Sequence, residues 1–342
     1  MNFSVPDFQD PQLAARVQHR LDQKTKPQGS LGRIEAVALQ MALVQGRENP
    51  RLDAPQMVIF AGDHGIAAQG VSAFPQEVTV QMVHNMLAGG AAISVLARQH
   101  GLALTVLDCG VKEDFAPAPG LVAAKCCRGS ADSTQTQALS DAECEAAIAN
   151  GAAFVRDLPG NVLMLGEMGI ANTSPAALLM ARLTGLSIEQ CAGRGTGLDP
   201  AGVAHKAAVL QRALDRHPDA KTPMAALAAL GGPEIATMVG AVLQAAALRR
   251  LIVVDGFITT SAVAVAAAIE PRVLGACVFS HGSAENGHGR WLSLLGVRPL
   301  VDLGLRLGEG SGAALAWPLI KSAELILAEM ASFESAQVSS AA

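Results

Sequence analysis

Six short runs of apolar residues recur along the chain, with helical patterns between several of them. The runs are Met57–Ala61, Leu102–Leu107, Val162–Leu165, Leu251–Val254, Leu274–Phe279 and Pro299–Leu303. Because each run is continuous and does not alternate with polar residues, it predicts a strand that is buried on both faces. Helical patterns at 75–100 and 233–249 lie between them. The sequence therefore predicts an α/β fold with a doubly wound, mainly parallel, Rossmann-like sheet.

Both ends of this pattern are predicted to be helical. Residues 1–50 contain a break at Lys24–Ser30 followed by a helical segment from Leu31 to Gln45, and residues 313–333 have the spacing of a long amphipathic helix. We expect these helices to pack together as a small subdomain beside an α/β nucleotide-binding body of residues 51–312. Residues 334–342 are rich in Ser, Ala and Gln, which predicts a disordered tail.

Polar side chains follow the predicted strands at their carboxyl ends. They are Asp63, His64, Glu167, Asp255, His281 and Glu309. Open α/β sheets bind ligands in the crevice beyond these ends. Turns need glycine and polar residues in any protein, but that need explains the glycines better than it explains these acids and histidines. We therefore expect the functional site at this edge of the sheet.

Composition and charge exclude several classes of function. Half of the 342 residues are apolar, only 3% are aromatic, and the net charge of −5 comes without a basic run, so we expect no nucleic-acid partner. The longest apolar stretch, 257–269, is too short to span a membrane, and the first ten residues lack the basic and apolar regions of a secretory signal. Six scattered cysteines without a C-x-x-C pair indicate reduced thiols, which predicts a cytoplasmic protein.

A single carboxylate, Glu309, lies between Gly308 and Gly310, after a predicted strand and before a predicted helix. Glycine-rich turns at such positions usually bind phosphate through backbone N–H groups, and a carboxylate there would repel the phosphate. Two interpretations stay open at this point. Glu309 either faces solvent, where the helix dipole favours it, or is a base aimed at a neutral or cationic substrate.

Other glycine and histidine motifs do not reach an established pattern. Gly193–Gly197 and Gly308–Gly312 both read G-x-G-x-G, one residue short of the dinucleotide fingerprint, and there is no P-loop. His281, Glu285 and His288 could be metal ligands, although intervening glycines and the absence of an established zinc spacing disfavour a metal site. A metal-dependent hydrolase is the alternative that these residues keep open.

The segment that follows Val162–Leu165 predicts a strand end that turns into a helix, with Thr173 or Ser174 as its N-cap. This arrangement leaves Glu167 and the backbone amides of 168–170 facing the crevice, where they can bind hydroxyl groups and a phosphate. Lys206 is a lone lysine. Such a side chain is typically exposed unless the fold brings it over an anion.

Six motifs occur in order along the chain. They are Lys26–Arg33, Phe60–Gly65, Gly70–Thr79, Gly166–Asn172, Gly193–Gly197 and Arg306–Gly312. Together they resemble the nicotinate-nucleotide–dimethylbenzimidazole phosphoribosyltransferase family, collinearly from about residue 10 to about residue 330. The resemblance implies transfer of the 5-phosphoribosyl group of nicotinate mononucleotide to 5,6-dimethylbenzimidazole. The products are nicotinate and α-ribazole 5′-phosphate, the activated lower ligand of cobamides.

The resemblance implies that Glu309 is the general base. The pyridinium of nicotinate mononucleotide is cationic at its glycosidic nitrogen, so it leaves as a neutral molecule and needs no acid, metal or cofactor. The azole must lose its N–H proton as its other nitrogen attacks C1 of the ribose, and one carboxylate can accept that proton, a contribution of ~10²–10⁴-fold. Holding the two rings on opposite faces of C1 accounts for the rest and for inversion from β to α.

The resemblance also implies the substrate-binding residues. Glu167 is expected near the ribose. The residues expected around the 5′-phosphate and the rest of the nucleotide are Met168, Gly169, Ile170, Gly195, Thr196, Lys206 and Ser283. The residues expected around the benzimidazole are Ala73, Phe74, Gln81, Met82 and Leu307.

For Asp63 and His64 no reaction step is left, so the interpretation is a structural role. The resemblance implies a homodimer whose partners are small molecules, and the preferred acceptor base stays open. Two further hypotheses are transfer to another acceptor, such as a purine or a phenol, and a nucleotide-binding protein without catalytic activity.

Overall fold

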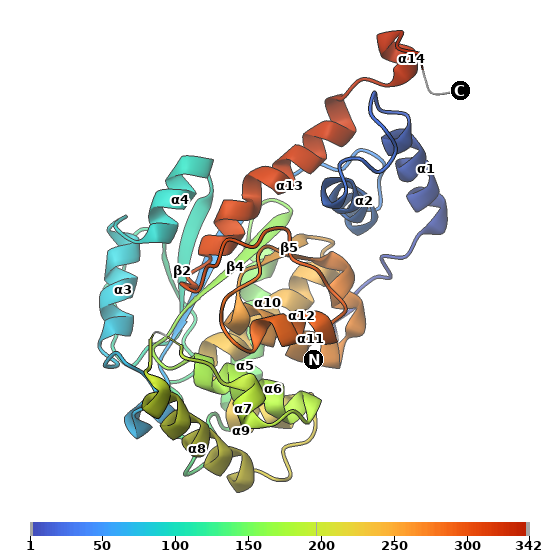
Figure 1. Ribbon diagram of the computed structural model, residues 1–342. Coiled ribbons are helices and arrows are strands. Elements are labelled where there is room, and N and C mark those ends of the chain that lie inside the picture. Colours follow the sequence, from blue (N-terminus) through green and yellow to red (C-terminus); the bar gives the residue numbers. More distant parts are fainter. Residues whose placement is uncertain (1–2, 196, 340–342) are drawn as a thin grey trace.

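A computed structural model describes residues 3–195 and 197–339 of the chain. Its centre is one six-stranded parallel sheet in the order β3-β2-β1-β4-β5-β6 (Figure 1). The strands are β1 (Gln56–Gly62), β2 (Ala103–Gly110), β3 (Leu121–Ala123), β4 (Val162–Met168), β5 (Leu251–Val254) and β6 (Cys277–Phe279). The predicted doubly wound parallel sheet is therefore confirmed.

The strand order reverses between β1 and β4, which lie side by side at the centre. Along the chain the sheet grows outward from β1 to β3 and then outward in the other direction from β4 to β6. Phe60 pairs with Glu167 and Ala61 with Met168, so β1 and β4 end at the same level. A crevice opens beyond such a reversal because the connections leave the two strand ends in opposite directions.

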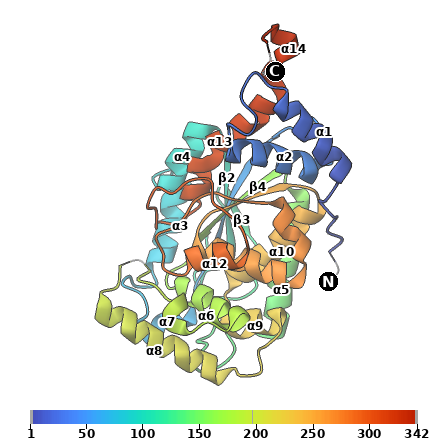
Figure 2. The same cartoon turned by 45° about the vertical axis from the view of Figure 1, so that its right-hand side comes forward.

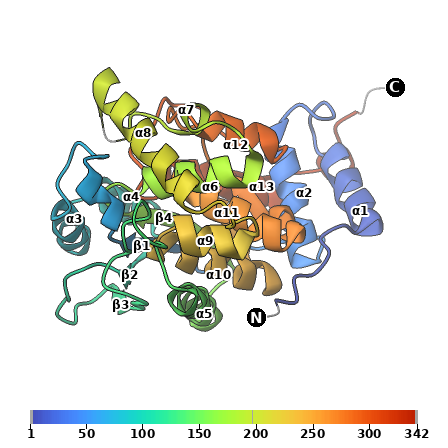
Figure 3. The ribbon, with the colours of Figure 1, turned by 90° about the horizontal axis from the view of Figure 1, so that it is seen from below.

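Helices cover both faces of the sheet, as Figures 1 and 2 show. The helices on one face are α5 (Asp141–Asp157), α10 (Pro233–Ala247) and α11 (Phe257–Ile269), and those on the other are α3 (Val78–Leu87), α4 (Ala92–His100) and α13 (Ser311–Glu329). Four further helices follow β4 at the carboxyl end of the sheet, towards the viewer in Figure 3. They are α6 (Thr173–Thr184), α7 (Ile188–Cys191), α8 (Pro200–Arg216) and α9 (Pro223–Leu230).

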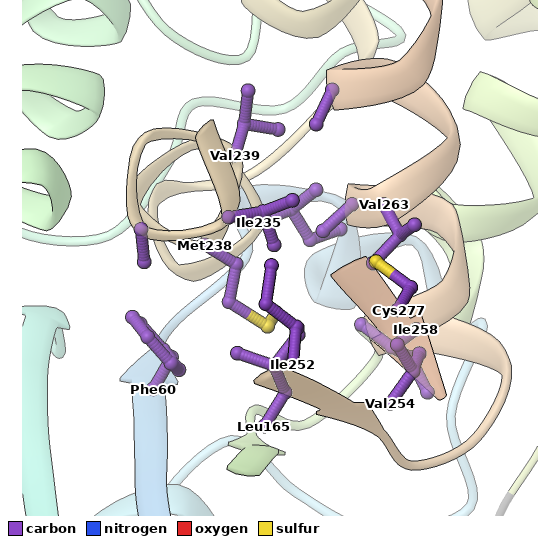
Figure 4. Packing of buried hydrophobic residues seen from close by; sticks show 14 of the residues in the cluster. Phe60, Leu165, Ile235, Met238, Val239, Ile252, Val254, Ile258, Val263 and Cys277 are labelled. Atoms are coloured by element: carbon purple, nitrogen blue, oxygen red, sulfur yellow. The ribbon is translucent and has the colours of Figure 1, made fainter. Parts of the chain in front are cut away.

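The core between the sheet and α10 is aliphatic, as expected from a chain without tyrosine (Figure 4). Phe60 of β1, Leu165 of β4 and Ile252 of β5 pack under Met238 of α10. The neighbouring helices α5 and α10 approach so closely that a Cβ atom at Gly240 would lie 1.9 Å from the backbone oxygen of Ile148. Glycine and alanine at the helix contacts hold the sheet and its strand ends in a close-packed frame.

The two ends of the described chain meet. Helices α1 (Pro11–Asp22) and α2 (Arg33–Gln45) pack against each other, α2 packs against α13, and Lys24 forms an antiparallel bridge with Ser332. This is the packing expected of a small helical subdomain, while the division of the chain at residue 50 stays a prediction. Where a disordered tail was expected from residue 334, the structure has a four-residue helix, α14 (Phe333–Ala336), and residues 340–342 lie outside the described residues.

The last two predicted strands differ from the structure. Leu274–Phe279 becomes strand only from Cys277, because Pro271 opens the 3₁₀ helix η2 (Pro271–Ala276) that uses the first half of the run. Pro299–Leu303 forms no strand, and only Val301 makes an isolated bridge, to His281. Pro299 has no backbone N–H to donate, which limits pairing at the edge beside β6.

One predicted helix and one strand also differ. The helical pattern at 75–100 divides into α3 and α4, because the chain turns at Gly89, whose φ is +83°, and Gly90. Among the described residues, Val78–His100 is the segment that is long and apolar enough to span a membrane, with a mean hydropathy of 1.3. The break at Gly89 and Gly90 divides this segment into two helices. Strand β3 has three residues and was not predicted.

Candidate active site

A cavity of about 370 Å³ opens beyond the carboxyl ends of β4 and β5. Its walls come from α3 and the loop before it, the β4–α6 turn, the start of α11, the segment after β6 and the turn before α13. The structure places ten of the predicted site residues in this lining: Phe74, Met82, Glu167, Met168, Gly169, Ile170, Gly195, Ser283, Leu307 and Glu309. Ala73 and Gln81 are exposed and do not line the cavity, and Thr196 lies outside the described residues.

Lys206, on α8, is buried beside the cavity with only 1% of its surface exposed. Its Nζ donates a hydrogen bond to Thr173 Oγ1 at 2.7 Å, and a Cβ atom at Gly195 would lie 3.5 Å from the same nitrogen. Burial lowers the pKa of Lys206 to about 8, opposed by the charge of Glu285. No carboxylate lies within ion-pair distance of this ammonium in the described structure, so it is available to an anion in the cavity.

The start of α6 faces the same part of the cavity. The helix begins at Thr173 without a side-chain cap, although Thr173 or Ser174 was predicted to be that cap. The prediction was wrong because both residues are already helical, and Thr173 Oγ1 binds Lys206 instead. An uncapped helix start with a buried ammonium beside it is suited to an anion such as a phosphate.

Glu309 lies in a turn of three consecutive residues with left-handed backbone. The φ angles are +79° at Gly308, +59° at Glu309 and +74° at Gly310. Glu309 lines the cavity and is 8% exposed. Burial, and then the negative charge of Asp255, raise the pKa of Glu309 to about 7. A carboxyl group with this pKa can accept a proton near neutral pH, which the solvent-facing interpretation of Glu309 does not explain.

Glu167, at the end of β4, lies directly beneath this turn. Its Oε2 accepts a hydrogen bond from Asn172 Nδ2, and its Oε1 accepts one from the backbone N–H of Glu309 at 3.3 Å. Burial raises the pKa of Glu167 to about 8, against the hydrogen bond from Asn172 and with the charge of Asp255. Glu167 therefore carries a proton at neutral pH, whereas Glu309 is close to its midpoint.

Part of the cavity lining is apolar. Phe74, Val78, Met82 and Leu307 line it, and Phe74 and Leu307 expose about half of their surface to the opening. A flat, uncharged ring fits such a lining, because burying its faces releases water from apolar surface. Glu309 belongs to the same lining, so the cavity combines apolar side chains and a buried carboxyl group, with the buried ammonium of Lys206 next to its lining residues Thr173 and Gly195.

Comparison with known proteins agrees with this combination. A family model described as "Phosphoribosyltransferase" matches residues 7–338. The nicotinate-nucleotide–dimethylbenzimidazole phosphoribosyltransferase of Variovorax paradoxus (strain S110) is 60% identical over 98% of this chain and 96% of its own, and that of Dechloromonas aromatica (strain RCB) is 53% identical over 98% and 97%. The crystal structure of CobT from Thermus thermophilus superposes with a TM-score of 0.93 at 41% identity, over 97% of this chain and 100% of that one.

The chain belongs to this phosphoribosyltransferase family. It is therefore a pentosyltransferase that acts on small molecules, as the resemblance of the six motifs implied. Four of these motifs supply residues to the cavity: Gly70–Thr79, Gly166–Asn172, Gly193–Gly197 and Arg306–Gly312.

Asp63 and His64, from the motif Phe60–Gly65 of this phosphoribosyltransferase, lie outside the cavity lining. His64 Nε2 and Glu234 Oε1 are 2.9 Å apart, and Asp63 Oδ2 accepts a hydrogen bond from the backbone N–H of Lys112 at 2.9 Å. A Cβ atom at Gly169 would lie 3.1 Å from His64 Nε2, so the ring supports the β4–α6 turn from behind. These contacts agree with the structural role that the sequence suggested.

Two of the three residues weighed as metal ligands, His288 and Glu285, have other hydrogen-bond partners. His288 accepts a hydrogen bond from the backbone N–H of Ser283 at 2.9 Å through Nδ1 and lies 3.0 Å from Thr260 Oγ1 through Nε2. Glu285 Oε1 accepts one from the backbone N–H of Gly195 at 3.1 Å. Within residues 3–195 and 197–339, no group of three or more His, Cys, Asp or Glu side chains is arranged to hold a metal ion.

Sequence reasoning missed three parts of the site. Asn172 holds Glu167, Thr173 holds Lys206, and the start of α11 at Gly256–Thr259 lines the cavity. Asn172 lies within the motif Gly166–Asn172, but nothing in the sequence indicated that its side chain would contact Glu167. The signal for α11 was the same as for α6, a strand end followed at once by an apolar helix.

Proposed function

We propose that this enzyme transfers the 5-phosphoribosyl group of nicotinate mononucleotide to 5,6-dimethylbenzimidazole, giving α-ribazole 5′-phosphate and nicotinate. The names of the relatives support the two substrates. The observation that carries the proposal is Glu309, a buried carboxyl group with a pKa of about 7 in a cavity that also has apolar side chains in its lining and a buried lysine beside it.

The reaction needs one base. The nicotinate ring leaves as a neutral pyridine, because its glycosidic nitrogen is already cationic in the nucleotide. The azole attacks C1 of the ribose with one nitrogen while Glu309 accepts the proton of the other. A base whose pKa lies close to the working pH is the most effective acceptor of that proton, with a contribution of ~10²–10⁴-fold.

Binding of the benzimidazole and of the 5′-phosphate follows from the other residues in and beside the cavity. The benzimidazole would lie among Phe74, Met82 and Leu307, and the 5′-phosphate would lie at the start of α6 beside Lys206. Glu167, protonated at neutral pH, can donate a hydrogen bond to the ribose region as well as accept one. Placing the acceptor and the leaving group on opposite faces of C1 gives inversion from β to α.

We propose further that the enzyme works in the cytoplasm as a homodimer and needs no cofactor. Size-exclusion chromatography with light scattering of the purified protein measures the oligomeric state. A monomer at micromolar concentration would contradict the dimer.

The proposed reaction is tested with nicotinate mononucleotide and separate acceptors (5,6-dimethylbenzimidazole, benzimidazole, adenine and a phenol), with a chelator present, followed by mass spectrometry. We expect nicotinate and the ribosylated dimethylbenzimidazole in equal amounts. Transfer to adenine or phenol alone would keep the reaction and change the acceptor. Release of ribose 5-phosphate without any transfer, or loss of activity that a metal restores, would contradict the proposal.

A further inference from the structure

Asp255, at the carboxyl end of β5, holds the turn that contains Glu309 from both sides. Its Oδ2 accepts a hydrogen bond from the backbone N–H of Gly310 at 3.1 Å, and its Oδ1 accepts one from Ala313 at 3.0 Å. Asp255 is 1% exposed. The N-cap residue of α13 is Gly310, which has no side chain to cap the helix. The Asp255 carboxylate, supplied by another element, instead accepts hydrogen bonds from two amides at the start of this 19-residue helix.

The turn needs such an external constraint. Glu309 is the one residue of the three left-handed ones that is not glycine, and a non-glycine residue in this region costs roughly 1 kcal/mol or more. A Cβ atom at Gly312 would lie 2.0 Å from His281 Cδ2 and 2.8 Å from Asp255 Oδ1, so the backbone rests directly on these two side chains. The hydrogen bond to Gly310 N–H, adjacent to Glu309, fixes the strained residue where it is.

His281, after β6, balances the buried charge. Its Nε2 lies 3.6 Å from Asp255 Oδ1, the residue is 2% exposed, and neither ring nitrogen has a hydrogen-bond partner. Burial opposes protonation of this ring, but the interaction with Asp255, the backbone of Gly282 and the charge of Asp302 together outweigh burial, and the pKa of His281 is raised. A buried carboxylate without a cation beside it would be costly, so the two residues support each other.

We propose that Asp255 is the positioning residue for this reaction, which holds Glu309 in its left-handed conformation facing the acceptor, with His281 as its counter-ion. The inference rests on the proposed function, because it assigns Glu309 the role of base. Asp255, directly after β5, would act on the reaction through the backbone of the turn that contains Glu309. After burial, the negative charge of Asp255 is the second cause that raises the pKa of Glu309, so Asp255 acts on both the position and the proton affinity of the base.

Other titratable groups surround this pair, and every variant compared below keeps them. Glu167 lies on β4, His288 on α12 (His288–Leu294), Glu234 on α10 and Asp302 in the loop after α12. The pKa of His288 is lowered to about 4 by burial and by the charge of His281, so His288 is neutral throughout the working range. The pH dependence is therefore read as a difference between variants that share these groups.

The experiment compares Asp255→Asn, His281→Asn and the control Glu329→Gln with the parent enzyme, measuring kcat and the KM for each of the two substrates from acid to alkaline pH. An asparagine in place of Asp255 can accept only one of the two hydrogen bonds, and its side-chain nitrogen would face the other amide. We expect Asp255→Asn to lower kcat by ~10²-fold with little change in the KM for the nucleotide. The acid limb of the pH profile of kcat should move to lower pH, because the negative charge of Asp255, which contributes to the raised pKa of Glu309, is then absent.

His281→Asn should move the same limb in the opposite direction, to higher pH, because the charge of Asp255 is then unbalanced. Glu329→Gln removes an exposed carboxylate at the far end of α13 and should leave kcat and the acid limb unchanged. Shifts of the acid limb in opposite directions in Asp255→Asn and His281→Asn would support the inference. A parental kcat in Asp255→Asn would overturn it, and so would a reduced kcat in that variant with an unmoved acid limb. If Asp255→Asn does not fold, as thermal unfolding would reveal, an unmoved limb in His281→Asn overturns it. A parent enzyme without transferase activity refutes the proposed function instead.

Discussion

Glu167 Oε1 accepts a hydrogen bond from the backbone N–H of Glu309, with 3.3 Å between the two atoms. The contact joins the end of a central strand to a turn that lies 142 residues further along the chain. It places two buried carboxyl groups in one cavity with raised pKa values, about 8 for Glu167 and about 7 for Glu309. The two groups therefore differ at neutral pH: Glu167 is able to donate a hydrogen bond, and Glu309 is able to accept a proton.

The first prediction concerns Glu309 as the base. Glu309→Gln keeps the size of the side chain but cannot take up the azole proton, so turnover should fall by ~10²-fold or more while nucleotide binding survives. Steady-state kinetics and calorimetric titration with nicotinate mononucleotide measure the two effects. The control is Glu329→Gln, which changes an exposed carboxylate at the other end of α13.

Part of the defect in Glu309→Gln should vanish with an acceptor that is already anionic at the assay pH, because that acceptor has no proton to lose. Near-parental turnover of dimethylbenzimidazole by this variant would show that Glu309 is not the base. Glu167 would then be the next carboxyl group to test.

The second prediction concerns the buried cation. Lys206→Ala should weaken binding of nicotinate mononucleotide by roughly ten- to a hundredfold, since a hydrogen bond to a charged group contributes ~1.5–3 kcal/mol. Binding of dimethylbenzimidazole should change little. Lys221→Ala is the matched control, because Lys221 is exposed in the loop after α8. Equal nucleotide affinities for Lys206→Ala and the parent would place the phosphate elsewhere.

The third prediction concerns space under the turn. Gly308 and Gly304 both have left-handed backbone, with φ of +79° and +66°, but a Cβ atom at Gly308 would lie 2.2 Å from Glu167 Oε1, whereas one at Gly304 would have no neighbour within 4 Å. Alanine at either position costs about 1 kcal/mol of backbone strain. Gly308→Ala must also displace Glu167, so we expect a larger loss of thermal stability and at least tenfold lower kcat than for Gly304→Ala. Indistinguishable variants would contradict the close contact.

The fourth prediction concerns pH and stability. The pKa of Glu167 is raised from its ordinary 4.5 to about 8 by burial, so between these values the folded protein holds a proton that the unfolded chain has lost. The contribution of this group to stability is therefore largest at low pH and falls as the pH rises through that window. Glu167→Gln has no proton to lose. Its unfolding temperature relative to that of the parent should rise between about pH 5 and about pH 9.

Thermal unfolding of Glu167→Gln and of the parent in the same buffers provides the measurement. Glu309 titrates in both proteins, so the difference isolates Glu167. A constant difference across the range would mean that Glu167 is ionised in the folded protein at neutral pH.

Much of the fold was readable from the chain because buried parallel strands give continuous apolar runs. The runs at Met57–Ala61, Val162–Leu165 and Leu251–Val254 all lie within strands of the structure. Pro299–Leu303 was misjudged because an apolar run need not be buried or paired along its length: Leu303 is 58% exposed, and the segment bonds to the edge beside β6 only around Leu300 and Val301. How far such pairing extends depends on the sheet edge, which no local pattern encodes.

The site was readable to the extent that its residues sit in conspicuous turns. Glu309 stood out because a carboxylate between glycines is unusual in a strand-to-helix turn. Asp255 was visible as a polar strand end, but its two hydrogen bonds reach residues 55 and 58 positions away. Likewise nothing local to Lys206 predicts that Thr173 and Gly195 will enclose it, since α8 reaches the cavity only after the helices following β4 have packed.

The turn with Glu309 is followed by the longest helix of the described chain, α13, and the far end of that helix packs against α2 near the beginning of the chain. During synthesis, the strand end with Glu167 and the helix with Lys206 leave the ribosome long before this turn. A domain folds as a unit, and α13 contributes buried residues such as Trp317 and Ile320 to the core of this one. The turn that contains Glu309 can therefore take its place over Glu167 only when one of the last segments of the chain to be synthesised is available.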